Sequence, residues 1–155
     1  MGFETWQRRD RAPRLLRSRL HIHPLQQTAK LKIIDHNFPG LEHFADTLLW
    51  TDEWYEFGEE KIDGLKYLIT VDESTYDPAA TWQDRDADKS GKRIDRVGKG
   101  MGDFHPISWY HDYDGGRSFY TALGHIPGVY RDQYFLDHLY GGIYWAATGK
   151  GIDSN

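Results

Sequence analysis

The sequence contains no cysteine among its 155 residues. This absence excludes disulfide bonds, a thiol nucleophile and thiolate-ligated metal sites within these residues. The chain also lacks an apolar run long enough to cross a bilayer, and its N-terminus lacks the apolar stretch typical of a signal peptide. We therefore expect no association with a membrane and, for the chain as it stands, a cytoplasmic location.

Positive charge is scarce outside the N-terminus. The net charge is −5 overall, yet residues 1–20 carry six Arg against Glu4 and Asp10. The remainder is therefore strongly acidic. An Arg-rich arm can bind nucleic acid, or it can be a solvated tail. Because the acidic remainder would repel phosphate groups, we expect a poorly ordered, solvated arm and no nucleic-acid partner.

Aromatic residues are abundant at 15%, whereas hydrophobic residues make up 39% and charged residues 28%. This composition is typical of a globular domain, and the length suffices for one domain with a hydrophobic core. The six Trp and ten Tyr indicate either an aromatic-rich core or a surface that stacks flat ligands such as sugars. We expect most of them in the core.

Alternating or β-branched apolar segments predict five strands, at residues 28–35, 49–57, 65–71, 105–113 and 117–123. Asp114, Gly115 and Gly116 lie between the last two, and an Asp-Gly pair in this position is a strong hairpin signal. The polar stretch 77–102 is expected to be a long surface loop or a disordered insertion.

Residues 132–148 predict the one clear helix, with Asp132 as its cap and Gly149 beyond its end. Spacings of three and four predict an inward apolar face that comprises Phe135, Leu136, Leu139, Ile143 and Ala147. Two adjacent glycines inside the helix, Gly141 and Gly142, cost about 1 kcal/mol each relative to Ala. A close approach of the helix to the sheet would explain them.

The segment from His105 to Ala147 carries an ordered set of family motifs. It reads HPISWYHDYDGGRSFYTALGHIPGVYRDQYFLDHLYGGIYWAA. Upstream, TDEWYEF at residues 51–57, LITVDEST at 68–75 and His23-Pro24 stand in matching order. Together these motifs closely resemble the C-terminal part of the ThuA-like (trehalose utilisation) domain family over residues 21–148.

The resemblance implies an α/β fold with a partial flavodoxin-like sheet, related to class I glutamine amidotransferases, plus a C-terminal hairpin and one packed C-terminal helix. It also implies three parts: an unmatched Arg-rich segment at 1–20, the C-terminal part of a ThuA-like domain at 21–148, and a tail at 149–155. The family's N-terminal βα half has no counterpart here. We therefore expect a truncated domain that is inactive alone.

Asp52, Glu53 and His125 are the candidate catalytic residues implied by the resemblance. Neighbouring residues on a strand point to opposite faces, so only one of the two carboxylates is expected to enter a pocket as a general base. His125 follows Gly124 at a strand end, where an imidazole can exchange a proton near neutral pH. The alternatives are a solvated acidic edge and a histidine bonded to backbone.

Five further residues are expected to bind the sugar: Tyr55, Trp109, His111, Arg117 and Tyr120. Arg117 can clamp a sugar oxygen, or it can pair locally with Asp112 or Asp114. His111 can meet His125 across the hairpin, whose register the sequence leaves undetermined. His105 lies six residues before His111 on the same strand, roughly 20 Å away, so the two histidines cannot share a metal. His105 is better interpreted as a structural or edge histidine.

No metal site is predicted, and the sequence leaves any cofactor undetermined. Asp84, Asp86 and Asp88 have the alternate spacing of a calcium loop. An EF-hand needs Gly at its sixth position and Glu at its twelfth, but Lys89 and Asp95 stand there. A solvated loop is the better interpretation.

Three functions follow from these observations. The first is an enzyme of disaccharide, specifically keto-sugar, utilisation, with a small-molecule sugar as its partner. The second is a non-catalytic carbohydrate-binding or interaction module that stacks sugars on its exposed aromatic rings, for which the candidates are Trp50, Trp54, Trp109 and Tyr110. The third is a remnant with an exposed sheet edge, which would favour a homo-oligomer.

Overall fold

The computed structural model describes residues 20–57, 61–80 and 97–151. Its main sheet has five strands in the order β3-β2-β5-β6-β7, and a short pair, β1-β4, lies beside it. The strands are β1 (Leu20–Ile22), β2 (Gln27–Ile33), β3 (Thr47–Asp52), β4 (Glu56–Phe57), β5 (Lys66–Asp72), β6 (His105–Tyr113) and β7 (Gly116–Thr121).

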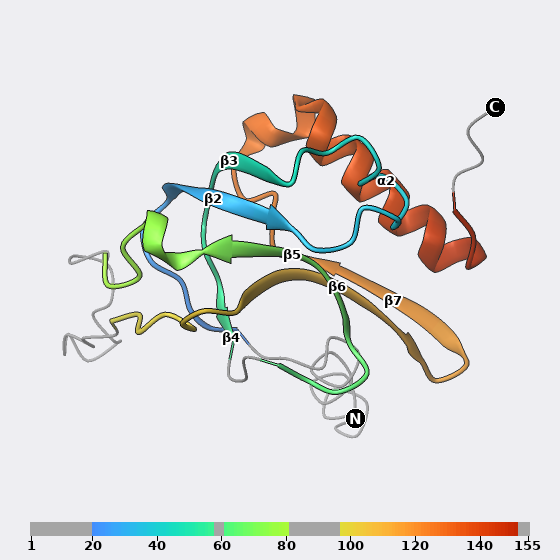
Figure 1. The fold of residues 1–155 in the computed structure, drawn as a ribbon, viewed down its shortest axis with the longest axis horizontal. Helices are drawn as coiled ribbons and strands as arrows, with labels where there is room; N and C mark the ends of the chain where they lie inside the picture. The colour runs from blue at the N-terminus through green and yellow to red at the C-terminus, as the bar shows by residue number, and fades with distance from the viewer. Residues whose placement is uncertain (1–19, 58–60, 81–96, 152–155) are drawn as a thin grey trace, which may run out of the picture.

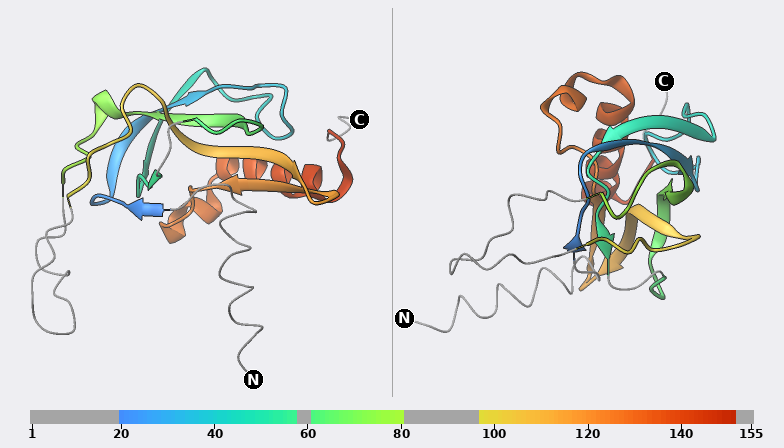
Figure 2. Two further views of the ribbon diagram at one scale, coloured as in Figure 1. Left: turned by 90° about the horizontal axis from the view of Figure 1, so that it is seen from below. Right: turned by 90° about the vertical axis from the view of Figure 1, so that its left-hand side faces the viewer.

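Every described strand pair is antiparallel. The helix α2 (Gln133–Thr148) lies alongside the curved sheet and packs against β7 (Figures 1 and 2). The mixed α/β class, the terminal hairpin and the single packed C-terminal helix are thus confirmed.

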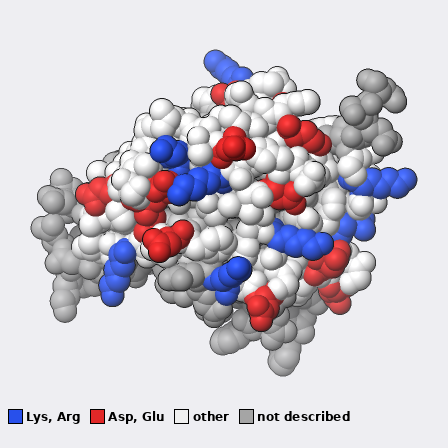
Figure 3. Space-filling model, viewed as in Figure 1, with Lys and Arg blue, Asp and Glu red and all other residues white. Residues whose placement is uncertain are grey.

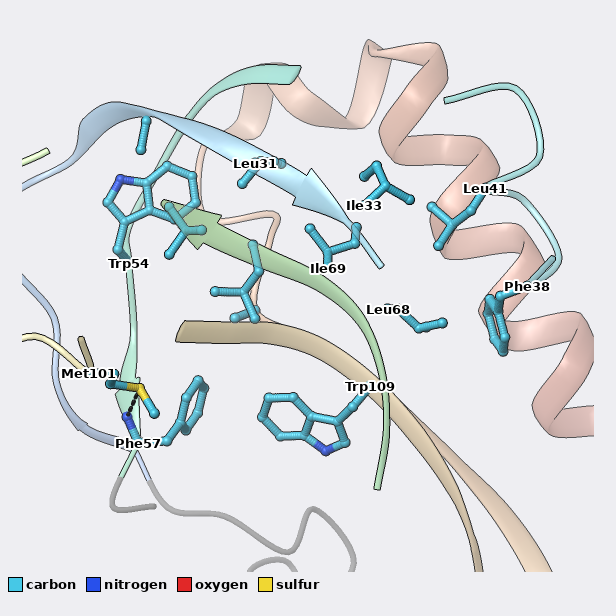
Figure 4. Close-up of a cluster of buried hydrophobic side chains, with 14 residues drawn as sticks. Leu31, Ile33, Phe38, Leu41, Trp54, Phe57, Leu68, Ile69, Met101 and Trp109 are labelled. Carbon is cyan, nitrogen blue, oxygen red and sulfur yellow. Dashed lines mark hydrogen bonds between the residues drawn. The ribbon is translucent and has the colours of Figure 1, made fainter. Parts of the chain in front are cut away.

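The hydrophobic core follows the alternation of β2. Ala29, Leu31 and Ile33 are buried, whereas the residues between them are exposed. The central strand β5 instead buries four consecutive residues, 68–71, because both of its faces are covered. The core continues to Trp109 on β6 (Figure 4), so most of the abundant tryptophan and tyrosine is used for packing.

The β6–β7 hairpin turns at Asp114 and Gly115, which both have positive φ, 50° and 76°. A two-residue type I′ turn requires positive φ at both of its central residues, and its backbone twist matches that of the two strands it joins. Tyr113 pairs with Gly116 directly across this turn. The predicted hairpin is therefore confirmed at its predicted position.

The helix boundaries are confirmed, but its predicted inward face is wrong. The Asp132 carboxylate accepts hydrogen bonds from the amides of Tyr134 and Phe135, and Gly149 ends the helix at φ 72°. Leu136 is 38% exposed and Ile143 is 57% exposed. Of the predicted face only Phe135 is buried; the helix otherwise buries His138, Gly141 and Gly142, because its glycines allow the backbone to approach the rest of the fold.

The single strand predicted at 49–57 is two strands in the structure. β3 ends at Asp52 and β4 begins at Glu56, because the chain between them turns and directs Glu53 toward His125 in the loop after β7. Two short 3-10 helices were also not predicted: η1 (Glu73–Thr75) and η2 (Pro127–Arg131). Most of the polar stretch 77–102 lies outside the described residues, as does nearly all of the Arg-rich segment.

Acidic and basic side chains are interspersed on the face shown in Figure 3. None of the helices in the described ranges combines the length and the apolar character needed to cross a membrane.

Candidate functional site

Asp52 sits at the end of β3 and is fully buried. Its Oδ2 accepts a hydrogen bond from the backbone amide of Gly124 at 2.8 Å. Its Oδ1 accepts from the amides of His125 at 3.1 Å and Glu53 at 3.0 Å. This carboxylate therefore fixes the turn that follows β7 against the end of β3.

Glu53 is 5% exposed and pairs with the side chain of His125. Its Oε2 lies 3.2 Å from His125 Nδ1 and 3.6 Å from His23 Nδ1. The His125 side chain is 45% exposed. A buried carboxylate thus holds Nδ1 of an exposed imidazole, and this arrangement directs the proton to Nδ1 and leaves Nε2 as the basic nitrogen.

Tyr55 completes this group. Burial raises the pKa of Tyr55, and the negative charges of Glu53 and Asp52 and a hydrogen bond to Glu53 add to the effect. Its ring centroid lies 5.4 Å from that of His23. The phenol is therefore protonated and donates its hydrogen bond to the Glu53 carboxylate.

The structure brings Asp52 and Glu53 to the same turn, contrary to the expectation from strand alternation. Because β3 ends at Asp52, Glu53 lies beyond the strand and does not follow the alternation. The two carboxylates differ in their partners. Asp52 contacts backbone amides, whereas Glu53 contacts titratable side chains, so only Glu53 is placed for proton transfer.

Two of the five residues expected to bind sugar contribute to packing beside this group. Trp109 is 2% exposed, and its ring lies 4.3 Å from that of Tyr120. Burial raises the pKa of Tyr120 to about 12, with a smaller contribution from Tyr55. Trp109 therefore belongs to the core and has no face for stacking, whereas Tyr120 lies near Tyr55.

His111 and Arg117 lie at the other end of the hairpin. His111 is opposite Ser118 in the register, and its Nδ1 lies 2.9 Å from the carbonyl of Asp112. It does not meet His125, which follows the far end of β7. The expected role of His111 in this site is therefore corrected.

Arg117 caps the C-terminus of α2. Its Nε donates to the carbonyls of Trp145 and Ala146, each at 3.1 Å, and Nη2 donates to that of Ala147 at 3.1 Å. The last carbonyls of a helix lack partners within the helix and carry its negative dipole end, so a guanidinium there is stabilising. The Arg117 guanidinium is thus engaged with the helix end, in place of the expected pairing with Asp112 or Asp114.

Sequence reasoning missed His23, which lies beside Glu53 and Tyr55. Its only signal was the His-Pro pair within the family resemblance. His105, expected to be structural, is fully buried. Its Nδ1 lies 2.6 Å from Glu73 Oε1 and its Nε2 lies 2.9 Å from the carbonyl of Tyr55, so it supports the Tyr55 backbone.

The described residues contain no cluster of three or more His, Asp or Glu side chains that could hold a metal ion. The calcium-like spacing at Asp84, Asp86 and Asp88 lies outside the described residues. What the described site can do chemically is bind hydroxyl groups and move a proton between a substrate and an imidazole.

An antiparallel sheet with a terminal hairpin, one C-terminal helix and a Glu–His pair at the strand ends defines an α/β domain with a candidate acid–base site. A family model described as trehalose utilisation (ThuA) matches residues 3–146. The chain therefore belongs to the ThuA family. The matched range includes residues 3–19, which the structure does not describe.

Two solved structures are similar to the chain. A ThuA-like protein from Bacteroides uniformis superposes with a TM-score of 0.57 at 16% identity, covering 85% of this chain and 48% of that one. A ThuA-like protein from Parabacteroides merdae gives 0.48 at 23% identity, covering 86% and 43%. The first likeness supports the fold, and the chain spans about half the length of both. No curated protein matches the chain.

Proposed function

We propose that this chain acts in the utilisation of trehalose or a related disaccharide, with Glu53 and His125 as its proton-transfer pair. The observation that carries the proposal is the 3.2 Å contact between buried Glu53 Oε2 and Nδ1 of the half-exposed His125. Membership of the trehalose-utilisation family supports the class of substrate.

In this proposal His125 is the general base. Glu53 accepts a hydrogen bond from Nδ1–H and stabilises the imidazolium that forms when Nε2 takes a proton. The substrate proton lies on a hydroxyl or on a carbon next to a ketone of an oxidised disaccharide. Tyr55 donates its one phenolic proton to Glu53, so its oxygen is left to accept a hydrogen bond from a sugar hydroxyl.

Asp52 has a positioning role in this proposal. Its carboxylate accepts hydrogen bonds from the backbone amides of Gly124 and His125. These bonds fix the position of the His125 imidazole relative to Glu53. Because the chain spans about half the length of the solved relatives, we further propose that it supplies one wall of the sugar site. The 155-residue chain is then expected to bind a disaccharide weakly and to turn none over.

Calorimetry and NMR titration with trehalose and its keto derivative test the proposal. We expect weak binding by the chain, lost in His125→Asn and reduced in Glu53→Gln. His36→Asn is the matched control, since His36 pairs with exposed Asp46 on another loop. Each variant must melt like the parent chain.

Two results would contradict the proposal. Disaccharide binding that is equal in the parent chain, His125→Asn and His36→Asn would place the sugar elsewhere. Turnover of the keto-disaccharide by the purified chain would show that no further wall is needed.

In the parent chain, the His125 ring nitrogens should show a protonated Nδ1 in long-range proton–nitrogen spectra.

The alternative of a non-catalytic carbohydrate-binding module has less structural support. Trp54 is fully buried and Trp109 is 2% exposed, so neither offers a ring face for stacking. Trp50 and Tyr110 are half-buried and pack against the core. The alternative predicts sugar binding that survives His125→Asn.

A further inference from the structure

A hollow of about 280 Å³ lies between the loop after β2 and the first half of α2. Its lining comprises Gly40, Glu42, His43, Phe44, Tyr134, Asp137 and Tyr140. The volume is close to the lower end of the range for small-molecule pockets. Neither Glu53 nor His125 lines it, so it is a separate feature from the proposed catalytic pair.

Aromatic rings form much of its wall. Phe44 and Tyr134 meet edge to face with ring centroids 5.0 Å apart. Tyr134 is 43% exposed and Tyr140 is 58% exposed, so both rings are accessible to a ligand. The face of an aromatic ring carries a partial negative charge and attracts cations.

Two carboxylates stand among these rings, each with one oxygen engaged. Glu42 Oε2 accepts a hydrogen bond from the amide of Gly40 at 2.7 Å. Asp137 Oδ1 accepts one from Gln133 Nε2 at 2.6 Å. Within the described ranges the second oxygen of each carboxylate has no partner, so both can face a ligand.

Histidines are the only basic side chains on the segments that build the hollow: His36 pairs with Asp46, His43 lines the hollow, and His138 is buried in the core. Residues 33–46 and 132–149 contain no Lys and no Arg. They contain five acidic residues: Asp35, Glu42, Asp46, Asp132 and Asp137. Such a wall repels anions, including phosphates and sugar acids, and attracts cations.

We propose that this hollow binds a small organic cation, an ammonium group that carries apolar substituents. The rings of Phe44, Tyr134 and Tyr140 contact the substituents, and Glu42 and Asp137 supply the compensating charge. A metal ion would not use the aromatic rings, and a neutral ligand would not use the negative charges of the two carboxylates. The site is independent of the proposed acid–base pair.

A pair of isosteric ligands separates charge from shape. Choline and 3,3-dimethylbutan-1-ol have the same branched outline, but only choline is charged. In an NMR titration of the full chain, choline should shift the amide signals of residues 40–44 and 134–140. The neutral alcohol should bind at least about three-fold more weakly, and added salt should weaken only choline binding.

Variants locate the site. Asp137→Asn and Tyr140→Leu should each weaken choline binding by about two-fold to five-fold. Asp63→Asn removes the same charge at an exposed position outside the lining and should leave binding unchanged. Tyr140 is largely exposed, and Asp137→Asn is isosteric, so at least one variant will keep the fold.

Three outcomes would overturn the inference: no choline binding, equal binding of choline and the alcohol, or equal effects of Asp137→Asn and Asp63→Asn. Binding of an uncharged disaccharide in this hollow without choline binding would overturn it as well. His125→Asn should leave choline binding unchanged, so failure here and failure of the proposed function are distinguishable.

Discussion

Asp52, Glu56 and Glu73 each direct a carboxylate toward the backbone of a loop that is distant in the sequence. Glu56 accepts hydrogen bonds from the amides of Lys99 at 3.1 Å and Gly100 at 3.0 Å. Hydrogen bonds to an ionised group are stronger than neutral ones. At the scale of single residues, the catalytic candidate Asp52 therefore holds a loop in place as Glu56 and Glu73 do.

His138 is the least expected polar residue of the core. It is fully buried, and burial lowers its pKa to about 3. Its Nε2 lies 3.0 Å from Ser108 Oγ, whose hydroxyl donates to the carbonyl of Tyr120 at 2.7 Å. Nε2 must therefore donate to Ser108, which leaves Nδ1 as an unprotonated acceptor without a partner.

This histidine predicts a loss of stability in mild acid. Below pH 6.5 the unfolded chain protonates His138, whereas the folded chain keeps it neutral down to about pH 3. The free energy of unfolding therefore falls between these values, by about 1.4 kcal/mol per pH unit at most. His138→Gln keeps an N–H donor and does not titrate.

Urea unfolding at pH 7 and pH 5 checks this prediction. The decrease in unfolding free energy between the two pH values should be smaller in His138→Gln than in the parent chain. His36→Asn is the control, because His36 is solvent-accessible and pairs with an exposed acid. An unchanged decrease in His138→Gln would show that other groups cause the pH dependence.

At the scale of elements, two glycines decide how α2 lies on the fold. A Cβ at Gly141 would lie 1.8 Å from the carbonyl oxygen of Pro39, and one at Gly142 would lie 2.3 Å from the ring of Phe119 on β7. Both distances are shorter than any tolerable contact. Gly142 therefore allows the close approach of helix and sheet that the sequence suggested, whereas Gly141 allows the helix to approach the loop after β2.

Gly142→Ala should destabilise the protein even though alanine favours helix by about 1 kcal/mol. Overpacking against Phe119 costs about 1–3 kcal/mol, so the net change is a loss. Thermal and urea unfolding measure it. Phe119→Leu in the same chain should recover part of the loss, and strict additivity of the two substitutions would show that the contact is not responsible.

At the scale of the whole molecule, the sheet order brings together segments far apart in the chain. Glu73, just after β5, accepts hydrogen bonds from the amides of Met101 and of Gly102, the latter at 2.9 Å. The same carboxylate lies 2.6 Å from His105 Nδ1. It therefore connects β5, the loop before β6 and β6 itself at one end of the sheet.

Glu73→Gln should loosen this loop, because the neutral amide replaces a charged acceptor and presents a donor to one of the backbone amides. We expect hydrogen exchange at Met101 and Gly102 to accelerate by about tenfold or more. Exchange at Leu31, in the middle of β2, should change much less. Similar acceleration at all three amides would indicate global destabilisation and contradict a local role.

The sequence predicted features that depend on residues close together in the chain. The alternation in β2, the Asp114-Gly115 turn and the Asp132 cap each involve only a few consecutive residues. The inward face of α2 was predicted wrongly because the prediction considered only the spacing of apolar side chains. The helix instead packs through Gly141 and Gly142, where backbone contact replaces side-chain contact.

The sequence by itself determined the strands β2, β5, β6 and β7, the hairpin and the ends of the helix, since these follow from hydrogen bonds and side-chain spacing within each segment. Only the tertiary structure decided which candidate residues meet. The curvature of the sheet brings the end of β3, one edge strand, beside the turn that follows β7, the other edge strand, so Glu53 contacts His125 (Figure 2). The hairpin register carries His111 and Arg117 to the opposite end. Contacts between segments depend on that register, which no local pattern encodes.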